Sequence, residues 1–128
     1  MTAGAKRVLL AEDDRFLRRA GEAALQRCGL AVIVAIDGDE ALALARQERP
    51  DLVLLDMQMP KRSGIEVLRE LRAQPETQDL RVLVLSGSSR DHDIEEFARL
   101  RVEGYWVKGQ ISLRDFGARV LSVLERRA

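Results

Sequence analysis

Three carboxylates in this 128-residue chain stand directly after short apolar runs. Glu12 and Asp13 follow the run at 7–11, and Asp56 follows the run at 52–55. Three carboxylates gathered in one place repel one another unless a cation or a proton relieves the repulsion. Oxygen ligands that leave positions for water and phosphate suit Mg²⁺ better than zinc or copper. These residues therefore predict a Mg²⁺ site.

Two further polar residues end apolar runs and would complete a site for a phosphoryl group. Ser86 follows the run at 82–85, and Lys108 follows the run at 104–107. The formal charges of three carboxylates, one Mg²⁺ and one lysine add to zero, so the metal and the lysine can share the charge of an incoming phosphoryl group. Asp56 is the expected nucleophile, because a carboxylate can form an acyl phosphate. Ser86 would donate a hydrogen bond to a phosphoryl oxygen.

The elements that must position these residues follow from hydrophobic periodicity. Short apolar runs predict strands at 7–11, 31–35, 52–55, 82–85 and 104–107. Several of the runs are continuously apolar, as expected for parallel strands that are covered on both faces. Between them, apolar residues recur every three or four positions, which predicts helices at 15–28, 39–47, 64–73, 91–100 and 113–126. This alternation is typical of a three-layer (βα)5 sandwich of the α/β class, in which ligands bind beyond the carboxyl ends of the strands.

Composition limits the class of protein further. With 46% hydrophobic and 33% charged residues, the chain has the balance of one compact globular domain. Lys plus Arg and Asp plus Glu number 21 each, so there is no overall basic field of the kind that non-specific nucleic-acid binding needs. No apolar stretch approaches the roughly 20 residues of a membrane-spanning helix, and none near the start is long enough for a secretory signal. We expect a single cytoplasmic domain over residues 1–128 that binds neither nucleic acid on its own nor a membrane.

Five motifs, in order and at the expected spacings, resemble the CheY-like receiver domain of two-component response regulators. The resemblance covers about residues 6–126, and the matching stretches are 8–14 (VLLAEDD), 54–60 (LLDMQMP), Gly64, 82–87 (VLVLSG) and 104–108 (GYWVK). Each motif alone is weak evidence, but five in order are highly specific. The resemblance implies the strand order 2-1-3-4-5 that CheY has.

The resemblance also implies what the acidic residues do. Asp56 would accept a phosphoryl group from the histidine of a sensor kinase or of a phosphotransfer protein. Mg²⁺ would be held by Glu12, Asp13, Asp56 and the main-chain carbonyl of Gln58. The protein would be a signalling switch rather than an enzyme, with self-catalysed phosphotransfer to Asp56 and slow autodephosphorylation as its only chemistry.

The family's output mechanism carries over to three residues of this chain. Lys108 would pair with the phosphoryl group, Ser86 would swing toward it, and Tyr105 would turn inward as Ser86 vacates its place. The new charge would thereby bias a two-state equilibrium. The surface formed by the fourth helix, the fifth strand and the fifth helix would then bind a downstream protein.

The chain departs from the family at two positions near Tyr105. Proline usually follows the lysine in a cis peptide, whereas Gly109 follows Lys108 here. Because a cis bond before a non-proline residue costs roughly 2.5–4 kcal/mol, we expect a trans Lys108–Gly109 bond and a reshaped loop. Where the family tends to have glycine, this chain has Arg101, so we expect the turn into the fifth strand to differ or to be strained.

Two other functions deserve comparison. Gly109 and Arg101 motivate a receiver-fold interaction module that binds partners without phosphorylation. A phosphohydrolase would use Asp56 as nucleophile, but such enzymes typically carry an acid two residues later, where this chain has Gln58. No G-x-x-x-x-G-K motif occurs, which argues against nucleotide binding. The five predicted strand and helix pairs leave no output domain within the chain, and whether it acts alone or within a longer protein stays open.

Four residues of other reactive or aromatic types receive structural interpretations. Cys28 is the one cysteine, so it excludes an internal disulfide, and we expect it to fill a small space in the core. His92 stands between two aspartates and is expected to be solvated rather than to transfer phosphate. Strand alternation sends Tyr105 and Trp106 to opposite faces, so we expect one to pack beneath a helix and the other to be partly exposed.

Overall fold

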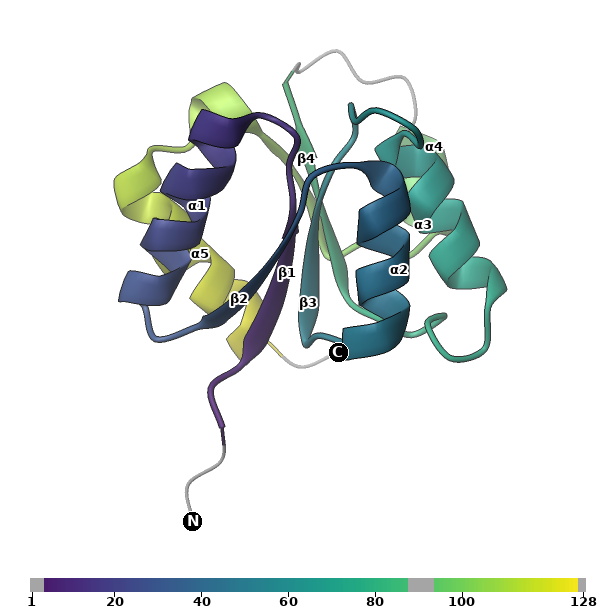
Figure 1. Ribbon diagram of the computed structural model, residues 1–128, viewed down its shortest axis with the longest axis horizontal. Coiled ribbons are helices and arrows are strands. Elements are labelled where there is room, and N and C mark those ends of the chain that lie inside the picture. The colour runs from purple at the N-terminus through teal and green to yellow at the C-terminus, as the bar shows by residue number, and fades with distance from the viewer. Residues whose placement is uncertain (1–3, 88–93, 127–128) are drawn as a thin grey trace.

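The computed structural model describes residues 4–87 and 94–126, in which strands and helices alternate (Figure 1). The strands are β1 (Arg7–Ala11), β2 (Ala31–Ala35), β3 (Leu52–Asp56), β4 (Val82–Ser86) and β5 (Gly104–Val107). The helices are α1 (Arg15–Arg27), α2 (Gly38–Glu48), α3 (Gly64–Ala73), α4 (Ile94–Arg99) and α5 (Leu113–Glu125). A short 3₁₀ turn, Lys108–Gln110, leads from β5 toward α5.

All five strands are parallel and form one sheet in the predicted order β2-β1-β3-β4-β5. Parallel neighbours need long crossover connections, and the helices supply them. The central strand, β3, lies between β1 and β4, so its last residue, Asp56, has a strand end on each side. The polar residues that follow the strands therefore meet at one edge of the sheet.

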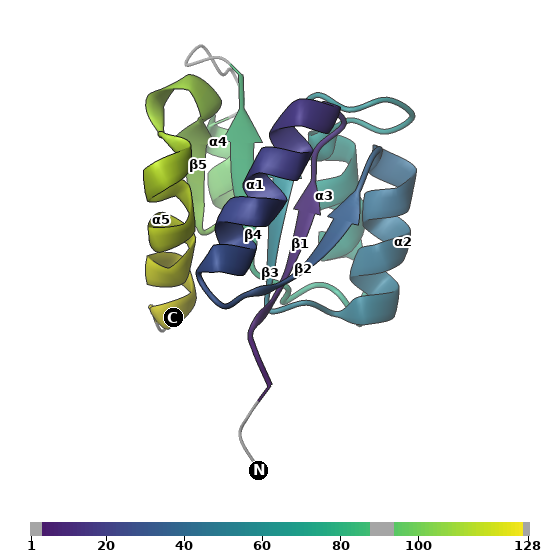
Figure 2. The same cartoon turned by 60° about the vertical axis from the view of Figure 1, so that its left-hand side comes forward.

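The helices cover both faces of the sheet, as Figures 1 and 2 show from two directions. One core lies under α1 and α5, and the other lies under α2, α3 and α4. Side chains of β3 alternate between them: Leu52 and Leu54 belong to the first core, and Val53 and Leu55 belong to the second. Both sets are fully buried. This two-sided burial explains why the strand sequences are continuously apolar.

Helix starts are set by side-chain caps. The Ser63 and Glu66 side chains each accept a hydrogen bond from the other residue's backbone N–H, and this capping box begins α3. Ser112 caps α5 by accepting from the Asp115 N–H at 3.2 Å. The predicted elements agree with the structure to within one residue at each end, except at the start of α4. There, the predicted residues 91–93 lie outside the described residues.

The two helices of the first core approach closely near Cys28, the residue that ends α1. Its Sγ would lie 2.5 Å from a Cβ placed on Gly117 of α5, so the absence of a side chain at 117 makes room for the thiol. Cys28 therefore packs between helices, as expected for a small apolar residue.

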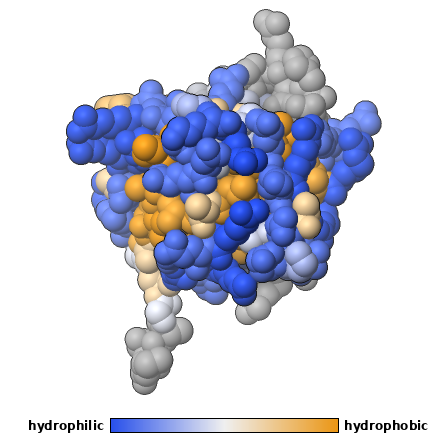
Figure 3. Space-filling model, turned by 45° about the vertical axis from the view of Figure 1, so that its right-hand side comes forward, coloured by the Kyte–Doolittle hydropathy of each residue, from blue (hydrophilic) through white to orange (hydrophobic). Residues whose placement is uncertain are grey.

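On the opposite side, the surface shown in Figure 3 is mainly hydrophilic, with apolar atoms visible between polar side chains. No helix in the described part of the chain is long and apolar enough to cross a membrane.

Candidate functional site

The ends of β1 and β3 bring two buried carboxylates together. Glu12 follows β1 directly and Asp56 ends β3, and each residue is only 3% exposed. The Glu12 N–H donates to the carbonyl oxygen of Ala35 at 3.0 Å, so pairing with β2 continues to the acidic residue. The exposed Asp13 completes the predicted group, because one carboxylate oxygen from each of the three acids lies within 4.8 Å of the others.

The turn between β1 and α1 is held by three sets of hydrogen bonds. The Asp14 N–H donates to Glu12 Oε2 at 3.1 Å, and Asp14 Oδ1 accepts from the Leu17 N–H at 2.9 Å. Asp14 is therefore the N-cap of α1 rather than a member of the carboxylate group. Arg18 Nη1 donates to the carbonyl oxygens of Glu12 at 3.1 Å and Asp13 at 3.2 Å. Helical spacing alone does not show a contact with the preceding turn, so this role of Arg18 was not predicted.

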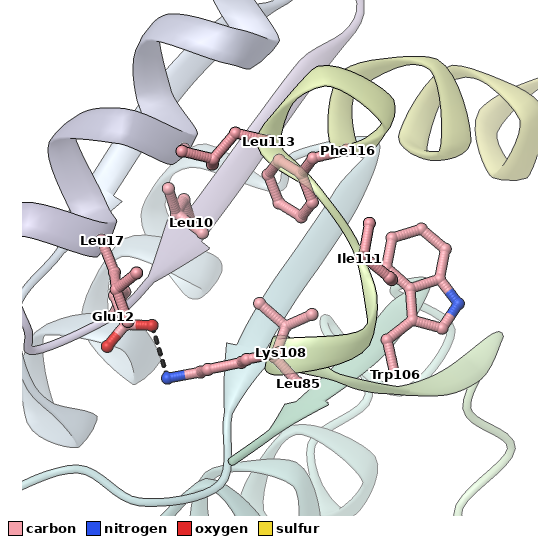
Figure 4. A pocket seen from close by; sticks show the side chains of 10 residues that line it. Leu10, Glu12, Leu17, Leu85, Trp106, Lys108, Ile111, Leu113 and Phe116 are labelled. Atoms are coloured by element: carbon pink, nitrogen blue, oxygen red, sulfur yellow. Dashed lines mark ion pairs between the residues drawn. The ribbon is translucent and has the colours of Figure 1, made fainter.

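Lys108 joins the two buried carboxylates. Its Nζ lies 2.6 Å from Glu12 Oε1 and 3.1 Å from Asp56 Oδ2. Figure 4 shows the side chain extended toward Glu12. Lys108 directly follows the edge strand β5. Its side chain therefore extends across the end of β4 to the acids at the ends of β3 and β1. The lysine thus supplies part of the positive charge that the carboxylates need.

Protonation of the site is shifted by burial and by these charges. Burial, reinforced by the charge of Glu12, raises the pKa of Asp56 to about 6, against the lowering effects of the Gln58 N–H and Lys108. Burial by itself would lower the pKa of Lys108, but its hydrogen bonds to Glu12 and Asp56 outweigh burial and raise it. The lysine therefore stays charged at neutral pH, and the nucleophile binds a proton more tightly than an exposed aspartate does.

The loop between β3 and α3 folds back onto Asp56. The Gln58 N–H donates to Asp56 Oδ1 at 3.2 Å, and the Gly64 N–H donates to the carbonyl oxygen of Met57 at 3.0 Å. A Cβ on Gly64 would collide with the Asp56 carbonyl oxygen and lie 2.7 Å from Met57 Cα. Gly64, one of the positions that match the family, is thus needed for the close approach of backbone to backbone. The Gln58 carbonyl remains a predicted metal ligand.

Ser86 and Tyr105 stand where the predicted switch needs them. Ser86 ends β4, next to the strand that ends in Asp56, and is 7% exposed. Tyr105 packs against the core beneath α2, α3 and α4, and its ring centroid lies 5.7 Å from that of Phe97 on α4. The predicted movements of Ser86 and Tyr105 remain predictions.

Trp106 lies on the opposite face of β5 from Tyr105, as strand alternation predicts. Its ring meets Phe116 of α5 edge-on, with centroids 6.4 Å apart and planes at 76°. The expectation that one aromatic residue would be packed and the other partly exposed is only partly met, because both are half-buried. The short β5 lies at the edge of the sheet, so neither face of it is fully covered.

Both departures from the family pattern are visible in the backbone. No cis peptide occurs among the described residues, so the Lys108–Gly109 bond is trans, as predicted, and lies in the 3₁₀ turn. Arg101 keeps a left-handed conformation, with φ of 60°, which costs an L-residue roughly 1–2 kcal/mol. Lys61, in the loop after β3, is also left-handed at φ 71°, and no sequence signal predicted it. His92 lies outside the described residues.

An apolar hollow of about 80 Å³ lies beside the lysine, between α1 and the segment that follows β5 (Figure 4). Leu17 and Leu113 line it and are 38% and 45% exposed, and Glu12 and Lys108 form its polar border. The hollow combines residues from separate elements, so sequence periodicity gave no sign of it. Its position makes an apolar surface continuous with the acidic site.

The donor set fits the predicted metal. One carboxylate oxygen each from Glu12, Asp13 and Asp56 can approach one point, and among the described residues no cysteine or histidine belongs to this group of possible ligands. Hard oxygen ligands with open positions suit Mg²⁺. Burial first, and then the charge of Glu12, raises the pKa of Asp56, and a cation beside these acids would favour the ionised form that Lys108 already contacts.

Comparison with known proteins assigns the fold and site to a family. The family model of the response regulator receiver domain matches residues 8–119, which include all the predicted site residues. The chain belongs to this family. It is a receiver domain of two-component response regulators, and receiver domains bind Mg²⁺ in an acidic pocket of this kind.

Two relatives are named as transcriptional regulators. The chain is 36% identical over 121 residues to the alkaline phosphatase synthesis transcriptional regulatory protein PhoP of Bacillus subtilis, covering 94% of this chain and 49% of that protein. It is also 36% identical over 119 residues to the transcriptional regulatory protein AfsQ1 of Streptomyces coelicolor, covering 93% and 51%. The chain thus spans about half the length of these relatives.

Solved structures of receiver domains share the whole architecture. The chemotaxis response regulator CheY4 of Vibrio cholerae superposes with a TM-score of 0.82 at 27% identity, covering 93% of this chain and 98% of that one. The receiver domain of the sensor histidine kinase PA1611 from Pseudomonas aeruginosa has a TM-score of 0.81 at 26% identity, covering 96% and 97%. That structure has a magnesium ion coordinated in its active site cleft.

Proposed function

We propose that this receiver accepts a phosphoryl group on Asp56 and uses it to change its binding surface. The observation that carries the proposal is the arrangement around Asp56: a buried carboxylate beside Glu12 and Asp13, with Lys108 paired to it at 3.1 Å. Glu12, Asp13, Asp56 and the Gln58 carbonyl would hold Mg²⁺. When bound, the metal would neutralise the carboxylates and orient the phosphoryl oxygens.

The protein's own groups account for the transfer. In its ionised form, Asp56 would attack phosphorus with a carboxylate oxygen, forming an acyl phosphate as the bond from phosphorus to the donor nitrogen breaks. Lys108 would then exchange part of its contact with the carboxylate for a contact with a phosphoryl oxygen. Ser86 would donate a hydrogen bond to another. Hydrolysis of the acyl phosphate would reset the domain, so the chemistry is that of a switch rather than of an enzyme that turns over a free substrate.

The switch would reach the surface through Tyr105. As Ser86 moves toward the phosphoryl group, Tyr105 would turn into the space it leaves, and α4, β5 and α5 would present a different surface to a downstream protein. Arg101 and Gly109 leave this scheme intact, since the turn keeps its left-handed residue and the lysine still reaches Asp56.

The proposed partners follow from this chemistry. The phosphodonor would be the histidine of a sensor kinase or of a phosphotransfer protein. It would have to approach the carboxyl ends of the strands, where the exposed side chains of Leu17 and Leu113 line the hollow beside the site. Because named relatives are transcriptional regulators of twice this length, a DNA-binding domain is one candidate for the downstream target. We propose that residues 1–128 work as one receiver unit in the cytoplasm.

The test is intact mass after incubation with Mg²⁺ and acetyl phosphate, followed in parallel by Trp106 fluorescence. The parent protein should gain one phosphoryl group, and Asp56→Asn should gain none. Adduct formation should be lost in EDTA. If no adduct forms although Mg²⁺ binds, and beryllofluoride leaves the fluorescence unchanged, the domain is an interaction module that works without phosphorylation.

A further inference from the structure

Two arginines on α3 hold α4 from one side. Arg69 and Arg72 are three residues apart, so their side chains leave the same face of the helix. Arg69 donates two parallel hydrogen bonds to Glu96 of α4, from Nε to Oε2 at 2.6 Å and from Nη2 to Oε1 at 2.8 Å. This fork geometry is the strongest form of an ion pair between two side chains. The Arg69 guanidinium also holds the pKa of Glu96 below its usual range.

Arg72 makes a different kind of contact at the other end of α4. Its Nε donates to the carbonyl oxygen of Leu100 at 2.7 Å, and its Nη2 donates to that of Arg101 at 3.3 Å. Its Nη1 donates to the carbonyl oxygen of Leu80, just before β4, at 2.7 Å. Arg72 is half-buried and bonds only backbone oxygens here, so a movement of side chains does not release it. The carboxyl end of α4 is therefore fixed to α3 and to the start of β4.

The residue next to the Arg69 contact faces the proposed switch. Phe97 is 3% exposed and packs on the ring of Tyr105, whereas its neighbour Glu96 is on the α3 side. A rotation of Tyr105 toward the space of Ser86 removes this ring contact and leaves Phe97 without part of its packing. A movement of the helix toward Tyr105 would stretch the ion pair between Glu96 and Arg69. The same short helix thus carries the contact that would move it and the contact that opposes the movement.

We propose that the Arg69–Glu96 pair is a latch that holds α4 in its unphosphorylated position, while Arg72 fixes the end of the helix about which it turns. This inference rests on the proposed function, since it concerns how phosphorylation reaches the α4 surface. The Arg69 side chain is 54% exposed and the Glu96 side chain 22% exposed. An ion pair of that exposure shifts an equilibrium by a factor of about 1.5 to 5, enough to tune a switch without locking it.

The experiment compares initial rates of phosphorylation by acetyl phosphate in Mg²⁺, read by intact mass. If a minor conformer is the one phosphorylated, opening the latch raises its population and the rate together. Glu96→Gln and Arg69→Gln should each raise the rate by about 1.5- to fivefold, and the double variant should be no faster than either. The charge swap Arg69→Glu with Glu96→Arg should return the rate toward that of the parent. The matched control is Glu95→Gln, which removes the same charge from the exposed neighbouring position.

Each possible result either supports or overturns the proposal that the Arg69–Glu96 pair is a latch. Equal acceleration by Glu95→Gln, additive single effects, or a swap as fast as the singles would overturn it in favour of a plain charge effect. Hydrogen exchange of the unphosphorylated, metal-free protein gives an independent answer: Glu96→Gln should speed exchange in α4 and β5 by a similar factor and leave α1 unchanged. If the parent takes up no phosphoryl group, the proposed function fails, and the exchange result alone then supports or overturns the latch.

Discussion

Asp56 should destabilise the metal-free fold at neutral pH, so replacing it with asparagine should make the protein more stable. The carboxylate is buried beside Glu12, and its pKa is raised from 3.8 to about 6. Asparagine has nearly the shape of the protonated acid and cannot ionise. Asp56→Asn therefore removes the charge that burial penalises, while Glu12 still pairs with Lys108 at 2.6 Å.

The sign and size of the effect follow from proton linkage. Below about pH 4, Asp56 is protonated in both the folded and unfolded states and contributes nothing. Between about pH 4 and 6 the folded state binds more protons than the unfolded state, so the free energy of unfolding falls as pH rises. Above the folded pKa of about 6 both states are ionised and the full penalty applies. A gap of about two pKa units corresponds to roughly 3 kcal/mol, which is the upper limit for the gain in Asp56→Asn.

The assay is urea unfolding in EDTA at pH 4.5, 6 and 7.5, with Glu76→Gln as the control at an exposed acid. The advantage of Asp56→Asn should be largest at pH 7.5 and shrink toward pH 4.5, and Mg²⁺ should reduce it by stabilising the parent selectively. An advantage that is absent at pH 7.5, or that is the same at every pH, would refute the assignment of a buried, raised pKa to Asp56.

Three further substitutions test the structure around the site. Gly64→Ala should cost about 1–3 kcal/mol in urea unfolding, because its Cβ collides with the Asp56 carbonyl, and should weaken Mg²⁺ binding measured by Trp106 fluorescence; unchanged binding would contradict the role of the close approach. Ser63→Ala should cost about 1 kcal/mol by removing the α3 cap, with no change in Mg²⁺ affinity. Arg101→Gly should raise the free energy of unfolding by about 0.5–1 kcal/mol, because glycine's greater loss of backbone entropy on folding offsets part of the strain that it relieves; a decrease would show that the arginine's contacts outweigh that strain.

The central strands could be predicted almost to the residue because burial on both faces leaves an unbroken apolar run in the sequence. Leu52–Asp56 and Val82–Ser86 are fully buried along their length, so each reads as an unbroken apolar run that stops at a polar residue. In a parallel sheet, the polar residue that ends each strand lies at the edge of the sheet where ligands bind. The positions of the acids and of Lys108 therefore followed from the same pattern that located the strands.

The contacts that long side chains make between elements could not be predicted from the sequence pattern. Arg18 donates to the carbonyls of the preceding turn, and Arg69 pairs with Glu96 across 27 positions of sequence. On a helix these arginines look like any solvated charge, since periodicity reports which face is apolar and not where a flexible side chain ends. The left-handed Lys61 was not predicted either, because lysine has no local preference for that conformation.

The features that weaken this fold are those on which its proposed function depends. Glu12 and Asp56 are held at neighbouring strand ends although their charges repel, and Lys108 offsets only part of that repulsion. A cation and a phosphoryl group that contacts the lysine would each gain free energy from the same imbalance. A phosphoryl group that draws Lys108 away from Asp56 must first break their ion pair, so whatever strengthens that pair in the empty site makes the lysine less available to the phosphoryl group. A more stable metal-free domain would, on this argument, be a poorer switch.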